Sequence, residues 1–203
     1  EGETHIPAPV EGTTPRVLTR KKDIEQVHIC LAFPGVEQDD EDLYPISVMN
    51  NLFGGGMSSR LFQRIREEMG AAYSVYSFPS TYTNCGTFTV YAGTSPETAQ
   101  QVADELHNQI RLLRDGGVTQ EEFDMAKEQL KVSYVLGLES SSARMSAIGR
   151  SKLLRGHAVD PQDVIRKIEA VTKEDVERVA HRMFGRPFSA SAVGRNIDGL
   201  KLL

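Results

Sequence analysis

The stretch that decides the fold runs from Gly54 to Ser77 and reads GGGMSSRLFQRIREEMGAAYSVYS. Its three leading glycines end one helix, and Ser58 or Ser59 is placed to cap the next. That next helix carries an apolar stripe at helical spacing, and Gly70 ends it as a C′ residue. The chain then enters a run rich in Tyr, Val and Phe, so it passes from helix to strand at Gly70.

Further strands are expected on both sides of this stretch. Ala71–Phe78 and Gly86–Gly93 predict an antiparallel hairpin with a longer loop. Upstream, the pattern is strand-like from Arg16 to Phe33, and its apolar end, which Pro34-Gly35 stops, is typical of a central strand. Pro187–Gly194 reads as a final short strand.

Helices are expected in the remaining long segments. Their predicted positions are Leu43–Phe53, a helix capped by Ser95-Pro96 and stopped by Gly116-Gly117, a helix from the Thr119–Glu122 capping box through Leu136, Ser140–Arg155, and a last helix opened by Thr172–Asp175. The pattern predicts an α+β fold, with a mostly antiparallel sheet of four to five strands and helices packed on one face. Residues 16–203 are expected to form this single domain, and residues 1–15 a linker or extended arm.

Composition excludes several functional classes. The 203 residues carry 28 acidic and 23 basic side chains, for a net charge of −5, which argues against a nucleic-acid surface. The longest apolar run is Ile29–Phe33, far short of the ~20 residues that a membrane span needs. The first residues do not resemble a signal peptide. Cys30 and Cys85 are predicted to be buried free thiols, which fits a reducing, cytoplasmic location.

The common catalytic motifs are missing. Neither H-E-x-x-H nor H-x-x-E-H occurs, and no two of the five histidines can share a helix face, so no metal site is predicted in this chain. Gly54–Ser58 precedes a helix N-terminus, which is able to bind an anion, but a tight interhelical turn explains the glycines equally well. The acidic cluster in residues 37–42 is interpreted as a solvated helix start.

One pair of residues forms a candidate site. Arg66 lies in the last full turn of the predicted helix, and Tyr73 lies early in the following strand. Because the Gly70 turn folds the strand back beside the helix end, a guanidinium and a phenol would point into the same space. Such fixed donors suit a peptide carbonyl or a developing oxyanion. The alternative is structural, with Arg66 balancing the helix dipole and Tyr73 packed in the sheet.

The stretch Gly54–Ser77 resembles the signature of the C-terminal half-domain of the pitrilysin/insulinase family of inverted-zincin metallopeptidases, above all its smaller bacterial processing-protease-like members. Supporting matches are Gln26–Gly35, Leu138–Met145 and Val171–Val176. The resemblance implies an α+β unit that is one of two related halves. The other, N-terminal half would hold Zn2+ with H-x-x-E-H and a distant Glu. This chain lacks that half and is therefore expected to be a separately made C-terminal fragment.

The resemblance also implies a mechanism. Zinc and a Glu in the missing half would activate a water for attack on a peptide carbonyl. Arg66 and Tyr73 match the family's pair that contacts substrate near the scissile bond, and would stabilise the developing charge or orient the peptide backbone. The implied function is the substrate-binding half of a zinc endopeptidase that closes over short or unfolded peptides. The chain alone is expected to hold no zinc and to cleave nothing.

Two other functions stay open at this point. One is a non-catalytic partner or scaffold subunit of the same fold, although the presence of both Arg66 and Tyr73 favours the enzyme. The other is an anion or nucleotide binder built on Gly54–Ser58. The expected partners are a peptide substrate and the zinc-binding half, on the same or a separate chain. A seam made for that half would also let the isolated chain form weak homodimers.

Overall fold

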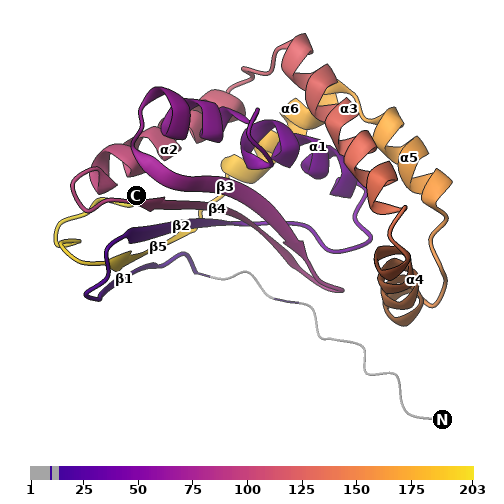
Figure 1. Cartoon of the computed structure of the whole chain (residues 1–203), viewed down its shortest axis with the longest axis horizontal. Coiled ribbons are helices and arrows are strands. Elements are labelled where there is room, and N and C mark those ends of the chain that lie inside the picture. Colours follow the sequence, from indigo (N-terminus) through magenta and orange to yellow (C-terminus); the bar gives the residue numbers. More distant parts are fainter. Residues whose placement is uncertain (1–9, 11–13) are drawn as a thin grey trace, which may run out of the picture.

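The structure, a computed structural model, describes residue 10 and residues 14–203, so the arm predicted over residues 1–15 lies almost wholly outside the described residues. The described part contains five strands, six α-helices and one π-helix (Figure 1). In chain order they are β1 (Val17–Lys21), β2 (Val27–Pro34), α1 (Leu43–Gly54), η1 (Phe62–Glu68), β3 (Ala72–Thr81), β4 (Gly86–Thr94), α2 (Ala99–Arg114), α3 (Gln120–Gly137), α4 (Ser141–Arg155), α5 (Pro161–Ala170), α6 (Lys173–Phe184) and β5 (Ser189–Gly194).

The strands form one sheet in the order β1-β5-β2-β4-β3. Every neighbouring pair is antiparallel except β1 and β5, which run parallel, so the predicted α+β fold with a mostly antiparallel sheet is confirmed. The hairpin predicted from residues 71–93 is the β3–β4 pair. The last strand, β5, lies between the first two.

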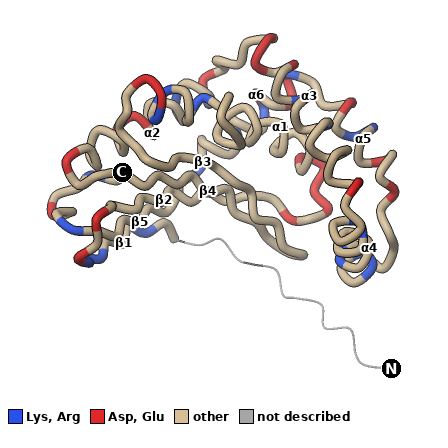
Figure 2. The backbone as a smooth tube through the Cα atoms, in the orientation of Figure 1, with Lys and Arg blue, Asp and Glu red and all other residues tan. Residues whose placement is uncertain are grey.

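The helices α1, α2 and α6 cover one face of the sheet, as predicted (Figure 1). Alternate residues of β2 and β4 point into the core on that side, including Ile29, Leu31, Phe88 and Val90, which are fully buried. The opposite face, called the open face below, carries the half-buried residues of the same strands, such as His28 and Tyr91. The strands β2 to β5 contain no Lys, Arg, Asp or Glu, so charge gathers on helices, loops and β1 (Figure 2).

Several helix ends follow the local rules. Thr119 and Thr172 form the capping boxes that start α3 and α6, and Ser140 caps α4 through the Ala143 amide. Gly156 ends α4 in the left-handed region, at φ +78°. No helix in the described part of the chain is both long and apolar enough to cross a bilayer.

Other local predictions are wrong. The helix after β4 starts at Ala99 rather than at Ser95-Pro96. The Thr98 hydroxyl forms hydrogen bonds with the Thr94 hydroxyl and the Ala71 carbonyl, and residues 96–98 form a turn before the helix. The Ser59 hydroxyl donates to the Gly56 carbonyl (2.6 Å) instead of capping a helix. The helix α5 is absent from the predicted set, although Asp160 caps it and Pro161 occupies its first turn.

The cysteines also differ from their prediction. Cys30 and Cys85 are free thiols, but each is half-buried rather than buried. Desolvation raises the pKa of Cys30, with a smaller opposite effect from a hydrogen bond with Ser191.

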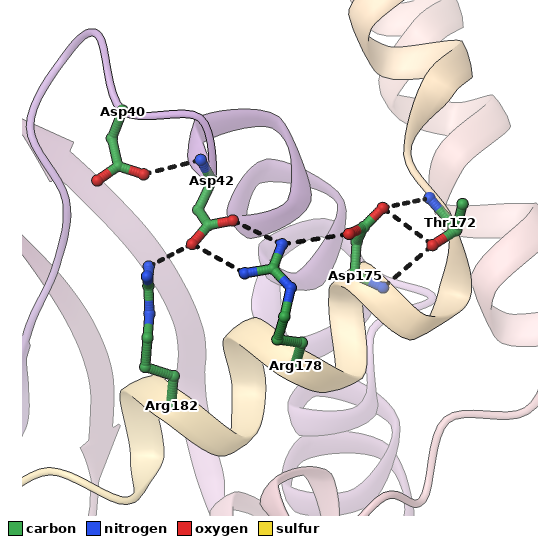
Figure 3. Close-up of polar contacts among 6 residues, drawn as sticks. All are labelled: Asp40, Asp42, Thr172, Asp175, Arg178 and Arg182. Carbon is green, nitrogen blue, oxygen red and sulfur yellow. Dashed lines mark hydrogen bonds and ion pairs between the residues drawn. The ribbon is translucent and has the colours of Figure 1, made fainter.

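The start of α1 is tied to α6 by a buried carboxylate (Figure 3). The Asp42 side chain is 1% exposed. Its carboxylate oxygens accept hydrogen bonds from the Arg178 guanidinium at 2.7 and 3.1 Å, and one of them forms an ion pair with the Arg182 guanidinium at 2.5 Å. The pKa of Arg178 is raised, first by the hydrogen bond of its side chain with Asp42 and then by that with Asp175. The prediction of a solvated acidic cluster is therefore wrong at Asp42, whose partners lie 136 or more residues further along the chain.

Candidate functional site

The structure brings Arg66 and Tyr73 together. Arg66 lies in the last turn of η1, and Tyr73 is the second residue of β3. The Arg66 guanidinium carbon is 5.8 Å from the centre of the Tyr73 ring and 4.9 Å from that of Phe62. Arg66 is exposed, and 74% of Tyr73 is open to solvent. The alternative of a Tyr packed in the sheet is therefore wrong, and both polar groups are available to a ligand.

The turn between the two residues is fixed by buried hydrogen bonds. Gly70 adopts φ +59°, which favours glycine, and the Ala71 amide donates back to the Ile65 carbonyl (3.0 Å). The Ala71 carbonyl accepts from the hydroxyls of Thr94 (2.5 Å) and Thr98 (3.0 Å). Thr94 ends β4 beside the start of β3, and Thr98 directly precedes α2. Local sequence rules give no signal for their contact with Ala71.

Two irregularities aim the side chains of the pair. The segment Phe62–Glu68 is a π-helix rather than the predicted α-helix, with the Met69 amide donating to the Arg64 carbonyl, five residues back. In β3, the register with β4 shifts between Ala72 and Ser74, which leaves Tyr73 as a bulged residue. A bulge redirects a side chain, and bulges are frequent beside active sites.

Arg66 differs from the other arginines of this segment. Arg60 is paired with Glu122, and Arg64 is paired with Glu68 and Glu105. Burial raises the pKa of Glu122, but hydrogen bonds from Arg60 and Thr119 outweigh it and lower that pKa to about 2. Arg66 has aromatic contacts but no carboxylate partner within the described part of the chain. Within the described residues, Arg66 is therefore the cation of η1 that has no ion pair.

A shallow depression lies beside the pair. Its volume is about 330 Å³, and its lining comes from the Gly70 turn, the residues just before β2 and the segment that leads into α2, namely Glu25, Gln26, Gly70, Ala71, Ala72, Tyr73, Thr94, Ser95 and Thr98. Tyr73 thus stands at the rim of a concave and largely neutral surface.

The glycine-rich loop has a packing explanation. A Cβ on Gly54 would lie 2.5 Å from both the backbone nitrogen and the hydroxyl of Ser77, so α1 approaches β3 there at backbone distance. The Arg60 guanidinium donates to the Gly117 carbonyl as well as to Glu122, and the Ser59 amide donates to Gly56. The Ser59 amide and the Arg60 guanidinium, which follow the loop, are therefore already used within the domain.

Metal ligands do not gather in this domain. Within residues 10 and 14–203, no three His, Cys, Asp or Glu side chains lie where they could share an ion. His28 is in β2, His107 in α2, and His157 and His181 lie at or near the ends of other helices. These residues do not fit a zinc site.

Sequence comparison identifies the family. The model described as the peptidase M16 inactive domain matches residues 3–130. The chain belongs to the peptidase M16 family. This confirms the resemblance carried by Gly54–Ser77, and the stretch with Arg66 and Tyr73 lies inside the matched part of the M16 domain.

Relatives of the M16 domain are longer proteins. A protein of Bacillus subtilis called "Uncharacterized zinc protease YmxG" is 40% identical over 176 residues, which cover 87% of this chain and 43% of the relative. An "uncharacterized zinc protease" of Streptomyces coelicolor is 42% identical over 179 residues, covering 88% of this chain and 39% of the relative. The M16 domain therefore spans about two fifths of the curated relatives that it matches.

Solved structures share the fold of the M16 domain. A crystal structure described as a peptidase M16 inactive domain from Pseudomonas fluorescens matches with a TM-score of 0.81 at 23% identity. The match covers 93% of this chain and 46% of that one.

Proposed function

We propose that this M16 domain is the substrate-contacting part of a zinc endopeptidase whose metal is held by the remainder of the protein. Three observations support the proposal. The relatives named zinc proteases are more than twice as long as the matched segment. The matching family model describes an inactive domain. The described residues offer no metal cluster of their own. The free thiols Cys30 and Cys85 fit a cytoplasmic location for the whole protein.

The Arg66–Tyr73 pair carries this proposal. The bulge and the π-helix place a phenol and an unpaired guanidinium side by side on an exposed rim. The Tyr73 hydroxyl donates to the carbonyl oxygen of a bound peptide as negative charge grows on that oxygen. The planar guanidinium of Arg66 offers two parallel N–H donors, which hydrogen-bond to the neighbouring peptide carbonyl and orient it. Because both groups are donors, they favour an uncharged peptide backbone rather than a cationic ligand.

Two conservative variants in the full-length M16 protein test this role. Tyr73→Phe removes one hydroxyl that acts mainly in the transition state, so kcat should fall by up to ~10²–10³ while KM changes little. Arg66→Lys keeps the charge but loses the planar fork, and should also lower kcat/KM. Steady-state kinetics with a quenched fluorescent peptide gives both constants.

The matched control is Tyr82→Phe. Tyr82 is 59% exposed near the end of the β3–β4 hairpin and makes no contact with Arg66. Its kinetics should equal those of the parent. Denaturant melts of all variants should agree within about 0.5 kcal/mol, because the altered groups are exposed. Unchanged kinetics in Tyr73→Phe would overturn the role and favour a non-catalytic partner or scaffold subunit. A preparation that is inactive before any substitution would have the same consequence.

A further inference from the structure

The open face contains a hollow at the side of the sheet that ends in β1. Its volume is about 540 Å³, and the neighbouring strands β1, β5 and β2 form it. Leu18 pairs with Ser191 and Ser191 pairs with Cys30, so the three lie in one row across these strands and point to the same face. The exposed side chains of Arg16 and Leu18 stand at the rim of the hollow, and the half-buried side chains of Cys30, Ala32, Ser189 and Ser191 form its floor.

The floor of the hollow is small and uncharged. The Ser189 hydroxyl already accepts a hydrogen bond from the Arg16 amide (3.1 Å), and Ser191 shares one with Cys30. Burial raises the pKa of the Cys30 thiol, so the thiol adds no negative charge at neutral pH. Because its polar groups are occupied and its side chains are small, the floor suits an aliphatic side chain.

The rim of the hollow, by contrast, is cationic. Among the described residues that line it, Arg16 alone is charged, and Arg20 lies two residues beyond Leu18 on the same face of β1. Neither guanidinium has a hydrogen-bond or ion-pair partner within the described residues. Lys21, which points to the other face of β1, is paired with Asp198. In a chain with a net charge of −5, this edge of the sheet therefore offers two unpaired cations to a carboxylate.

An uncharged floor beside unpaired arginines selects the kind of ligand. A small inorganic anion would pair with Arg16 but leave the floor empty, and a purely apolar molecule would leave Arg16 without a partner. A peptide segment with an aliphatic residue and an Asp or Glu two residues away meets both parts, because side chains two residues apart point to the same side of an extended chain.

The hollow also lies within reach of the Arg66–Tyr73 pair. β1 and β3 are the two edges of the five-stranded sheet, so four strand spacings of about 4.8 Å, roughly 19 Å in all, separate them. An extended peptide covers this distance in about six residues, at about 3.3 Å per residue. A single peptide that passes Arg66 and Tyr73 can therefore cross the open face and reach Arg16.

We propose that the hollow is a subsite for an acidic segment of the substrate peptide, in which an aliphatic side chain lies over Cys30 and Ala32 and a carboxylate two residues away pairs with Arg16. Arg20 adds attraction for acidic segments as they approach. The proposal rests on the proposed function, because the same peptide would pass Arg66 and Tyr73. It gives the domain a preference for aliphatic and acidic residues about six positions from the scissile bond.

Two matched peptides test the subsite. Both are fluorescein-labelled, end-blocked, unstructured 15-residue peptides, one with the central sequence Asp-Ser-Leu-Ser-Asp and the other with Asn in place of both Asp residues. Fluorescence anisotropy at low ionic strength should give this 203-residue chain a Kd about five- to tenfold lower for the Asp peptide, as one charge-assisted hydrogen bond at a partly exposed site would. Arg16→Gln should abolish this preference, Arg20→Gln should reduce it about twofold, and 1 M salt should reduce it in the parent.

Two more variants separate shape and net charge from the carboxylate contact. Ala32→Val narrows the hollow and should weaken binding of both peptides about threefold, because the leucine side chain loses part of its contact. Arg150→Gln is the control for charge. Arg150 is exposed on α4 rather than on the sheet, so this variant should bind both peptides as the parent does.

The outcomes separate the subsite from the proposed function. In the active full-length protein, Arg16→Gln should raise KM for the Asp peptide with kcat nearly unchanged, whereas Tyr73→Phe should lower kcat. Equal affinity of the parent chain for the two peptides, or an equal loss of the preference in Arg16→Gln and Arg150→Gln, would overturn the subsite alone. Sedimentation velocity that shows a parent dimer dissociating in Arg16→Gln, with peptide binding unchanged, would make this face an interface between copies and would also overturn it. Failure of the parent chain to bind either peptide at 1 mM would overturn both the subsite and the peptide-binding role of the domain.

Discussion

Replacing Asp42 with asparagine should be one of the most destabilising single polar substitutions in this domain. The Asp42 side chain is 1% exposed, and its carboxylate forms ion pairs with two guanidinium groups. Of the arginine side chains, 50% of Arg178 and 42% of Arg182 remain open to solvent. Asp42→Asn keeps the shape but turns a carboxylate into an amide whose NH2 group faces at least one guanidinium. The ion pairs that join the start of α1 to α6 would therefore be lost.

The magnitude follows from the burial of the three side chains. A hydrogen bond to a charged group contributes about 1.5–3 kcal/mol, and Asp42 takes part in three such contacts. Each arginine is half-exposed and regains water when the carboxylate is removed, which recovers much of that energy. We expect a net loss of about 2–3 kcal/mol in the free energy of unfolding. Removing both arginines should cost more, about 3–5 kcal/mol, because it leaves a buried charge without a partner.

Urea denaturation monitored by circular dichroism measures these losses. The midpoint should fall with little change in the m-value. Arg178→Met and Arg182→Met are the matched single variants, and each should cost less than half of the double variant because the remaining arginine still pairs with Asp42. A loss below about 0.5 kcal/mol for Asp42→Asn, or strict additivity of the two arginine variants, would refute the reasoning.

Two further predictions concern the scaffold around the site. The pKa of Glu122 is lowered from 4.5 to about 2, so its contribution is present above pH 4.5 and is lost as the pH falls through about 2. The stability gap between the parent and Glu122→Gln, measured by urea melts at pH 7, 4 and 2.5, should therefore shrink toward acid pH, and a constant gap would contradict this. Gly54→Ala should cost about 2–3 kcal/mol, because the new Cβ would lie 2.5 Å from the Ser77 backbone nitrogen, whereas Gly56→Ala meets nothing within 4 Å and should be nearly neutral. Thermal melts that rank these two glycine variants equally would count against the close approach of α1 to β3.

Local chemistry predicted most of the fold. The capping boxes at Thr119 and Thr172 and the β3–β4 hairpin depend on residues close in sequence, and the structure confirms all three. Elsewhere, contacts with residues far along the chain override the preferences of the local sequence. Thr98 starts α2 in place of Ser95 because its hydroxyl contacts Ala71 across the sheet edge. Asp42 is buried because Arg178 and Arg182 lie on one face of a helix far along the chain.

The candidate site, too, was predictable from the sequence only in part. The spacing of Arg66 and Tyr73 across the Gly70 turn was enough to predict that they meet. The five-residue hydrogen bonding of η1 has no signal in the local pattern, and the bulge at Tyr73 was not predictable because it depends on the register of β3 against β4.

The position of β5 between β1 and β2 has a consequence for biosynthesis. Val17 pairs with Ala190, so within the described residues β1 pairs only with β5, a strand that is made long after it. Throughout translation of the intervening residues, one edge of β2 stays open and available to other chains. Closing so long a loop also carries a large entropic cost and slows folding. Released fragments that stop before residue 189 should therefore depend on chaperones, and fragments that extend through the six residues of β5 should depend on them less.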